Sequence, residues 1–259
     1  MAEAIDYKHI GSRPVRPDGV DKVTGRAEFG GDVSLPGMII GKILRSPHAH
    51  ARIKSIDITD ALAIPGVHAV ITGEDFPGGG ISGEIDGEGG GSISDQAKNV
   101  IARDKVLYHG HALAAVAAIS DRAADRALDA IKVEYEVLSP VLDILEAIDP
   151  DSVLVNENNY TKLPEKPDRP SNIANVGNLV RGDIQEGFER ADVVIEREYV
   201  CPMTHQGYIE PHSCLASVDE EGKGTVWCST QGHFEFRNQT ASILKKNIAD
   251  LKFVAKEIG

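Results

Sequence analysis

A single glutamine, Gln231, is the side chain best placed to do chemistry in this sequence. It lies in the stretch Trp-Cys-Ser-Thr-Gln-Gly-His-Phe, where residues 226–228 predict a short strand and Gly232 predicts a turn. A neutral amide offers two donors and one acceptor, which suits a metal oxo group or the edge of a pterin better than an ionised substrate. The structural alternative is that the same amide bonds the backbone of a neighbouring loop.

The charge balance of the chain excludes one large class of partner. Its 259 residues carry 27 lysine and arginine side chains against 40 aspartates and glutamates, which gives a net charge of −13. No basic cluster interrupts this acidic character, so a phosphate backbone would be repelled. We therefore expect no nucleic-acid partner.

The composition is typical of a globular protein. Apolar residues make up 41% and charged residues 26%, and the length allows two domains that each have a core. No apolar run approaches the roughly 18 residues that a membrane helix needs. The first residues show neither a signal-peptide pattern nor a twin-arginine pair, so we expect no membrane span and a location in the cytoplasm.

The three cysteines, Cys201, Cys214 and Cys228, do not have the spacing of a metal or disulfide framework. They include no CxxC pair, which excludes the usual pattern of iron–sulfur ligands. A zinc site would have to add His205 and His212, but these residues lack the close pairing that fixes tetrahedral geometry. We therefore predict no metal ligand in this chain and interpret the cysteines as small residues buried in strands.

The first part of the chain, residues 1–150, predicts a domain of mixed strands and helices. Residues 13–32 are rich in Pro, Gly and Asp and predict an extended, turn-rich segment rather than a helix. The glycine-rich, acidic stretch at 77–92 lacks the positive charge of a phosphate cradle and is interpreted as a mobile surface loop. Apolar runs and period-two alternation predict strands at 38–44, 52–58, 67–71, 105–108, 112–119 and 133–137, with a helix at 121–131.

A Pro- and Asn-rich linker at 151–171 separates this domain from a second one, residues 172–259. Strands and helices do not alternate strictly, so the fold class is α+β rather than a doubly wound sheet. In the second domain the pattern predicts helices at 184–190 and 238–247, strands at 193–200 and 251–255, and a hairpin of 215–218 with 225–228.

Several short motifs in the first domain occur together at consistent spacing. The clearest is Leu-Arg-Ser-Pro-His-Ala-His-Ala-Arg-Ile at residues 44–53, and the others lie at 16–25, 65–75, 106–118 and 133–135. In this order they resemble the molybdenum-binding subunit of the xanthine dehydrogenase and aldehyde oxidase family, the molybdenum hydroxylases. The resemblance implies that the first domain is the family's α/β hammerhead domain.

The second domain resembles the opening of the family's molybdopterin-binding domain, through residues 191–194, 210–212 and 229–232. In relatives, a glutamine at the position of Gln231 donates a hydrogen bond to an oxo ligand of the molybdenum. The resemblance therefore implies a molybdenum–molybdopterin cofactor contacted by Gln231 and Gly232. It also places Glu210 near the substrate channel, although a carboxylate beside Pro211 would equally cap backbone.

The resemblance stops before the family's catalytic segments. In relatives the strand that matches 251–255 runs into a glycine-rich GGGFGGK-like segment, and a later segment supplies the catalytic glutamate. Neither has a counterpart here, so we assign no catalytic residue and expect this chain alone to be inactive. The resemblance implies a split subunit or a fragment, completed by another polypeptide and by partner domains or subunits with 2Fe-2S and FAD.

Two functions follow from these observations. The first is the N-terminal part of a molybdenum hydroxylase that hydroxylates an N-heterocycle or an aldehyde, a small-molecule substrate, with oxygen from water. The alternative is a non-catalytic docking or scaffold module that keeps the same fold and binds partner subunits. The two differ in whether the polypeptide that completes the domain brings the missing cofactor segments.

Overall fold

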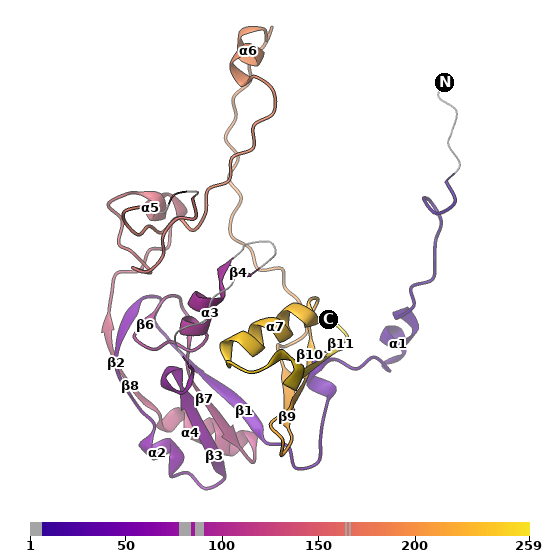
Figure 1. Cartoon of the computed structure of the whole chain (residues 1–259), viewed down its shortest axis with the longest axis vertical. Helices are drawn as coiled ribbons and strands as arrows, with labels where there is room; N and C mark the ends of the chain where they lie inside the picture. The colour runs from indigo at the N-terminus through magenta and orange to yellow at the C-terminus, as the bar shows by residue number, and fades with distance from the viewer. Residues whose placement is uncertain (1–6, 78–83, 86–90, 164, 166) are drawn as a thin grey trace. The chain divides into compact units, whose positions relative to one another are not determined.

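The computed structural model describes residues 7–77, 84–85, 91–163, 165 and 167–259 (Figure 1). The chain divides into two compact units. We call Met38–Gln206 the central unit, and Met1–Gly37 with Gly207–Gly259 the terminal unit. Each unit is described by itself.

The central unit contains two three-stranded antiparallel sheets, with strand orders β1-β7-β3 and β6-β2-β8. The first sheet consists of β1 (Ile40–Arg45), β7 (Ala112–Ala118) and β3 (Val67–Thr72). The second sheet consists of β6 (Lys105–Val106), β2 (Ala51–Asp57) and β8 (Lys132–Val137). A two-stranded ladder joins β4 (Glu84–Ile85) to β5 (Gly91–Ser92).

Strand β7 lies at the centre of the core because it is apolar on both faces. Ala114, Val116 and Ala118 pack with α2 (Thr59–Leu62) and α4 (Asp121–Ala130). Leu113 points the other way and packs with a second cluster of Ala51, Ala102 and Val106. Alternate side chains of a strand face opposite sides, so one strand serves two clusters.

The terminal unit is built on a three-stranded sheet of order β11-β10-β9. The middle strand β10 (Gly224–Ser229) is antiparallel to β9 (Cys214–Val218) and parallel to β11 (Leu251–Lys256). Parallel strands need a crossover connection, and α7 (His233–Ile243) lies on that connection. The chain therefore leaves β10 directly into the turn that precedes α7.

The remaining helices are short. They are α1 (Gly19–Thr24), α3 (Ile93–Asn99), α5 (Ile144–Ile148) and α6 (Ile184–Glu189), with 3-10 turns at Gly30–Asp32, Gly73–Asp75 and Ile248–Asp250. None of the helices in the described part of the chain is long and apolar enough to cross a bilayer.

Most of the predicted elements are confirmed, and the mixture of strands and helices confirms the α+β class. The predicted helix at 121–131 is α4, which begins where the Ser120 side chain accepts from the Ala123 N–H at 3.3 Å. The predicted hairpin is the antiparallel pair β9 and β10. The strand predicted at 105–108 stops at Val106, and the turn before His111 leads into a strand of the other sheet.

Three predictions of secondary structure were wrong. Residues 193–200 form no strand: they are exposed and have no ladder partner among the described residues, and a strand needs a neighbour for its backbone hydrogen bonds. Within 13–32 the chain forms α1, which Gly25 ends in the left-handed conformation at φ 74°. The last helix spans His233–Ile243 rather than 238–247, because Lys245 takes a φ of 52° and ends it earlier.

Two sequence predictions stay predictions. The mobile loop predicted at 77–92 falls largely on residues 78–83 and 86–90, which lie outside the described residues. The domain boundaries at 150 and 171 stay a prediction as well. Just after the predicted linker, the Asn172 amide donates to the carbonyl of Val153 at 2.9 Å and accepts from the N–H of Val155 at 2.9 Å.

One buried histidine, His111, couples the central unit to pH. Its side chain is 0% exposed and stacks on Tyr108, with 4.4 Å between the ring centroids. Nδ1 accepts from the Leu107 N–H at 3.3 Å, so Nε2 carries the proton and donates to the Asn99 carbonyl at 2.7 Å. Burial lowers the pKa of His111 from its ordinary value of 6.5, and the ring is neutral in the folded chain.

We predict that the free energy of unfolding falls as the pH is lowered from about 7.5 to about 5.5. Below about pH 6.5 the unfolded chain binds a proton at His111, whereas the folded chain keeps this ring neutral. The contribution of His111 is therefore complete above pH 6.5, the ordinary value, and is lost as the pH falls towards the lower pKa of the folded state. Urea unfolding followed by circular dichroism at each pH measures this slope.

The variant His111→Gln separates this histidine from the others. A glutamine can accept and donate in the same place but does not titrate, so the slope should become flatter. The matched control is His68→Gln, because His68 is exposed on β3 and should leave the slope unchanged. An unaltered slope in His111→Gln would contradict the assignment.

Candidate functional site

Gln231 lies in the short turn between the end of β10 at Ser229 and the start of α7 at His233. The residue is exposed. Within the described chain its side-chain amide makes no hydrogen bond, so the bond to a neighbouring loop that the structural alternative requires is not formed. An exposed neutral amide thus follows the end of the strand by two residues, and the roles of Gln231 and Gly232 as cofactor contacts stay predictions.

Gly232, the second predicted cofactor contact, already uses its backbone N–H. That N–H donates to the Thr230 hydroxyl at 3.1 Å and closes the turn. A Cβ at Gly232 would meet only the Cβ of Glu235, at the ordinary contact distance of 3.8 Å. The chain therefore offers the amide of Gln231, rather than the N–H of Gly232, as its open polar group in this turn.

Glu210, the predicted channel residue, has both carboxylate oxygens occupied. Oε1 accepts from the Ser229 hydroxyl at 2.6 Å and from the Gly30 N–H at 3.4 Å, and Oε2 accepts from the Gly259 N–H at 2.7 Å. These bonds, first the one from Ser229 and then the one from Gly259, hold the pKa of Glu210 below its ordinary value. This geometry suits the capping alternative, and a role of Glu210 in a substrate channel stays a prediction.

The N-terminal segment before Gly30 pairs with the end of β11. Phe29 forms a parallel bridge with Glu257, and the Glu257 N–H donates to the Glu28 carbonyl at 3.1 Å. Ion pairs join Lys256 to Glu28 at 2.7 Å and Lys22 to Glu257 at 3.1 Å. Sequence spacing could not reveal these contacts, because they join residues more than two hundred positions apart.

The cysteine and histidine residues of the zinc alternative do not form a cluster. The interpretation of the cysteines as residues buried in strands was right for Cys228 alone, because Cys201 and Cys214 are exposed and Cys201 lies in no strand. In the part of the chain that the structure describes, no three His, Cys, Asp or Glu side chains gather as a metal site would require. A further histidine, His50, bonds the Ser139 carbonyl through Nδ1 at 2.7 Å.

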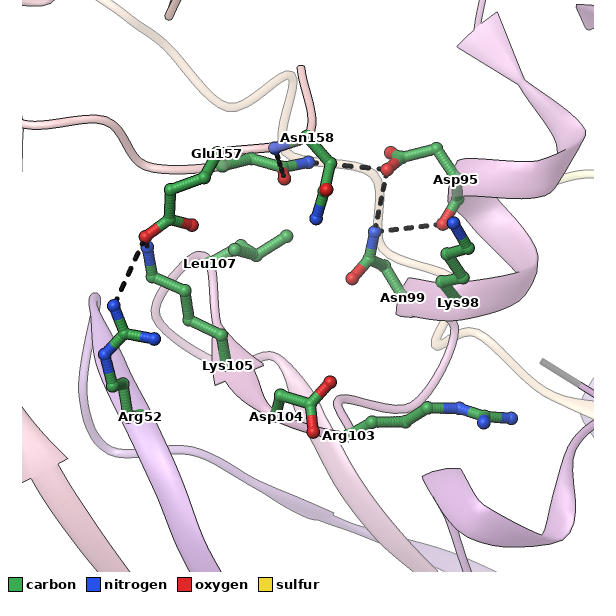
Figure 2. Close-up of a pocket in the computed structure, with 11 residues that line it drawn as sticks. Arg52, Asp95, Lys98, Asn99, Arg103, Asp104, Lys105, Leu107, Glu157 and Asn158 are labelled. Atoms are coloured by element: carbon green, nitrogen blue, oxygen red, sulfur yellow. Dashed lines mark hydrogen bonds and ion pairs between the residues drawn. The ribbon is translucent and has the colours of Figure 1, made fainter. Parts of the chain in front are cut away.

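The central unit has a polar pocket of about 470 Å³ beside α3. Figure 2 shows its wall of charged and amide side chains, and its lining residues are Arg52, Asp95, Lys98, Asn99, Arg103, Asp104, Lys105, Leu107, Asn156, Glu157 and Asn158. None of the predicted site residues belongs to this wall. The pocket is therefore a feature separate from the turn at Gln231.

Three charged side chains of this pocket pair with one another. Glu157 Oε1 pairs with Lys105 Nζ at 2.9 Å and with Arg52 Nη2 at 3.5 Å (Figure 2). Burial alone would raise the pKa of Glu157, but these cations, Lys105 above all, hold it below its ordinary value. The Asn99 amide donates to the Asp95 carboxylate at 3.0 Å. The described lining contains no serine, cysteine or histidine, and we assign no chemistry to the pocket.

Two family models match the chain. Residues 24–139 match "Aldehyde oxidase and xanthine dehydrogenase, a/b hammerhead domain", and residues 165–259 match "Molybdopterin cofactor-binding domain". The chain belongs to the xanthine dehydrogenase and aldehyde oxidase family. Both domains that the sequence motifs implied are thereby confirmed, and the members that the chain resembles are molybdenum oxidoreductases.

Two curated relatives of the family align along nearly the whole chain. A probable xanthine dehydrogenase subunit of Bacillus subtilis (strain 168) is 34% identical over 95% of this chain and 30% of its own length. The nicotinate dehydrogenase large molybdopterin subunit of Eubacterium barkeri is 34% identical over 98% of this chain and 55% of its own length. The chain thus spans between a third and about half of these relatives.

Solved structures of the family share the fold. The aldehyde oxidoreductase of Desulfovibrio gigas superposes with a TM-score of 0.76 at 25% identity, over 94% of this chain and 26% of its own. The CO dehydrogenase of Oligotropha carboxidovorans superposes with a TM-score of 0.74 at 28% identity, over 96% of this chain and 31% of its own. Both likenesses extend over nearly the whole of this chain.

One residue of the described chain, Gln231, has the chemistry to contact a molybdopterin cofactor. The family implies an uncharged donor at the end of the strand, and the free amide of Gln231 has that chemistry. Glu210 does not add a free ligand, because its oxygens are engaged by Ser229, Gly30 and Gly259. In the described part of this chain, a molybdopterin cofactor would therefore meet one open polar group rather than a complete cradle.

The burial of β10 gives a testable difference among the thiols. Burial raises the pKa of the Cys228 thiol, and the Cys214 thiol on the facing strand adds to this effect. The thiolate is the reactive form, so iodoacetamide should alkylate Cys228 at least about tenfold more slowly than Cys201 or Cys214 in the folded chain. Peptide mass spectrometry measures the three rates, and in urea they should converge. Equal rates in the folded chain would contradict the structure of this strand.

Proposed function

We propose that this chain is the N-terminal part, as a split subunit or a fragment, of the molybdenum-binding subunit of a molybdenum hydroxylase. The reaction would be the hydroxylation of an electron-poor carbon in an N-heterocycle or an aldehyde with oxygen from water. The observation that carries this proposal is the exposed amide of Gln231, which lies free at the end of β10 within the stretch that matches a molybdopterin cofactor-binding domain. When bound, the molybdenum cofactor supplies the oxidation chemistry.

Within this function, Gln231 donates a hydrogen bond to the cofactor. A neutral donor fixes the orientation of its acceptor without adding charge, and it stabilises negative charge that develops on that acceptor during turnover. Gly232 contributes by closing the turn on the Thr230 hydroxyl, at 3.1 Å, so that the amide is carried on a short, defined stretch of backbone. The hammerhead domain, residues 1–150, would form part of the wall of the substrate channel.

The names of the relatives support both proposed substrate classes, N-heterocycles and aldehydes. One relative is a nicotinate dehydrogenase subunit, which acts on a heterocycle, and one solved neighbour is an aldehyde oxidoreductase. We propose that electrons leave through 2Fe-2S and FAD groups carried by partner domains or subunits. We propose the cytoplasm as the location of the assembly.

Replacement of Gln231 by alanine tests the proposal. In the assembled enzyme, purified from its host through a tag on this chain, Gln231→Ala should lower kcat by about tenfold to a hundredfold. The loss follows from removal of a contact that orients the cofactor, while the exposed position of the side chain leaves the fold intact. Turnover with an N-heterocycle and with an aldehyde, together with molybdenum content, is the measurement.

The matched control is Gln185→Ala on α6, another exposed glutamine, whose amide bonds Glu189 at 3.0 Å. This variant should keep the wild-type kcat. Unchanged turnover in Gln231→Ala would remove the proposed role of that residue. A tagged chain that purifies without molybdenum would overturn the proposed function and favour the docking or scaffold alternative.

A further inference from the structure

Three distant segments of the terminal unit meet at one carboxylate, that of Glu210. The donors are the Ser229 hydroxyl at 2.6 Å, the Gly259 N–H at 2.7 Å and the Gly30 N–H at 3.4 Å. They come from the end of β10, from the residues after β11 and from the N-terminal segment. We call Glu210 and these three residues the Glu210 cluster.

The chemistry of the cluster demands an acceptor that carries no donor of its own. Two backbone N–H groups and one hydroxyl hydrogen point at the same pair of oxygens, and an ionised carboxylate is the side chain that offers acceptors only. A glutamine at position 210 would replace one oxygen by an NH₂ group and oppose a donor with a donor. The cluster therefore distinguishes Glu from its closest neutral analogue.

Ser229 links this cluster to the turn that carries Gln231. It is the last residue of β10 and lies two positions before Gln231. Its hydroxyl donates to Glu210 and at the same time accepts from the Gly30 N–H at 3.0 Å. The backbone from which the turn departs is thus held by the carboxylate through a single intermediate side chain.

Gly30 shows how closely the segments approach. A Cβ at this position would lie 2.8 Å from the backbone oxygen of Ser213 and 3.2 Å from the hydroxyl oxygens of Ser213 and Ser229. These distances leave no room for a side chain larger than hydrogen, so a glycine is required here. The N–H of Gly30 is thereby brought within reach of both Ser229 and Glu210.

We propose that Glu210 is a positioning residue that fixes, through Ser229, the end of β10 that presents Gln231. It does the same at Gly259 for the backbone that follows β11. This proposal rests on the proposed function in one respect, namely that the turn at Gln231 contacts the cofactor. The fixing of the backbone itself does not depend on a cofactor.

Other contacts hold the terminal unit together without Glu210. The Lys256–Glu28 ion pair and the bridge of Phe29 to Glu257 join the N-terminal segment to β11. Strand β10 keeps its ladders to β9 and β11. Loss of the carboxylate should therefore loosen the turn and the residues after β11 while the sheet stays folded.

The first experiment is amide hydrogen exchange on the purified 259-residue chain, in the wild type and in Glu210→Gln. We expect exchange about tenfold faster around residues 229–232 and 257–259, with exchange in β7 unchanged. The control is Glu220→Gln, since Glu220 is exposed in the turn between β9 and β10. Unchanged exchange around 229–232 in Glu210→Gln overturns the proposal, even if the wild-type chain binds molybdenum.

The second experiment separates positioning from a general structural role in the assembled enzyme. Glu210→Gln and Ser229→Ala should each lower kcat about tenfold while KM and molybdenum content stay at the wild-type values. Faster exchange with an unchanged kcat overturns the positioning role and leaves the proposed function intact. A wild-type assembly without molybdenum overturns the proposed function, whereas hydrogen exchange on the chain still decides whether Glu210 fixes the turn.

Discussion

Backbone pairing on both edges of β10 is the constraint on which the candidate site depends. Every residue from Gly224 to Ser229 has a partner in β11, and those as far as Cys228 also have one in β9. A strand held on both sides has little freedom to shift, so the place where it ends is set by the sheet. Gln231 follows two residues later, and its position is therefore determined by backbone hydrogen bonds rather than by its own side chain.

The Glu210 carboxylate complements this constraint where the ladder stops. A chain with a net charge of −13 gains nothing from a further carboxylate unless donors compensate it. Glu210 receives three donors from three segments, whereas the neighbouring pairs Lys256–Glu28 and Lys22–Glu257 each join only two partly exposed side chains, and solvent weakens such pairs. We attribute the local order at the end of β10 mainly to the hydrogen bonds of the carboxylate and less to the ion pairs.

Whether an element could be predicted depends on how far apart in the sequence its interacting residues lie. Local signals were sufficient for α4, with its Ser120 cap, and for the strand that ends before Gln231, because both depend on neighbouring residues. They failed at 193–200, where the apolar pattern of a strand is present but the described chain supplies no partner. The contact of Glu210 with Gly30 joins positions 180 residues apart, and no local pattern could reveal it.

Magnitudes indicate what a turn with one free amide can do for a cofactor. A neutral hydrogen bond contributes about 0.5–1.5 kcal/mol, whereas nanomolar retention of a ligand requires about 12 kcal/mol. In the proposed function, the amide of Gln231 would therefore contribute little to holding the cofactor and would act on its orientation. Orientation depends on how rigidly the donor is carried, and a loosened turn would weaken it before affinity changed. The rigidity of the backbone at Ser229 thus matters more for turnover than the strength of the single hydrogen bond it supports.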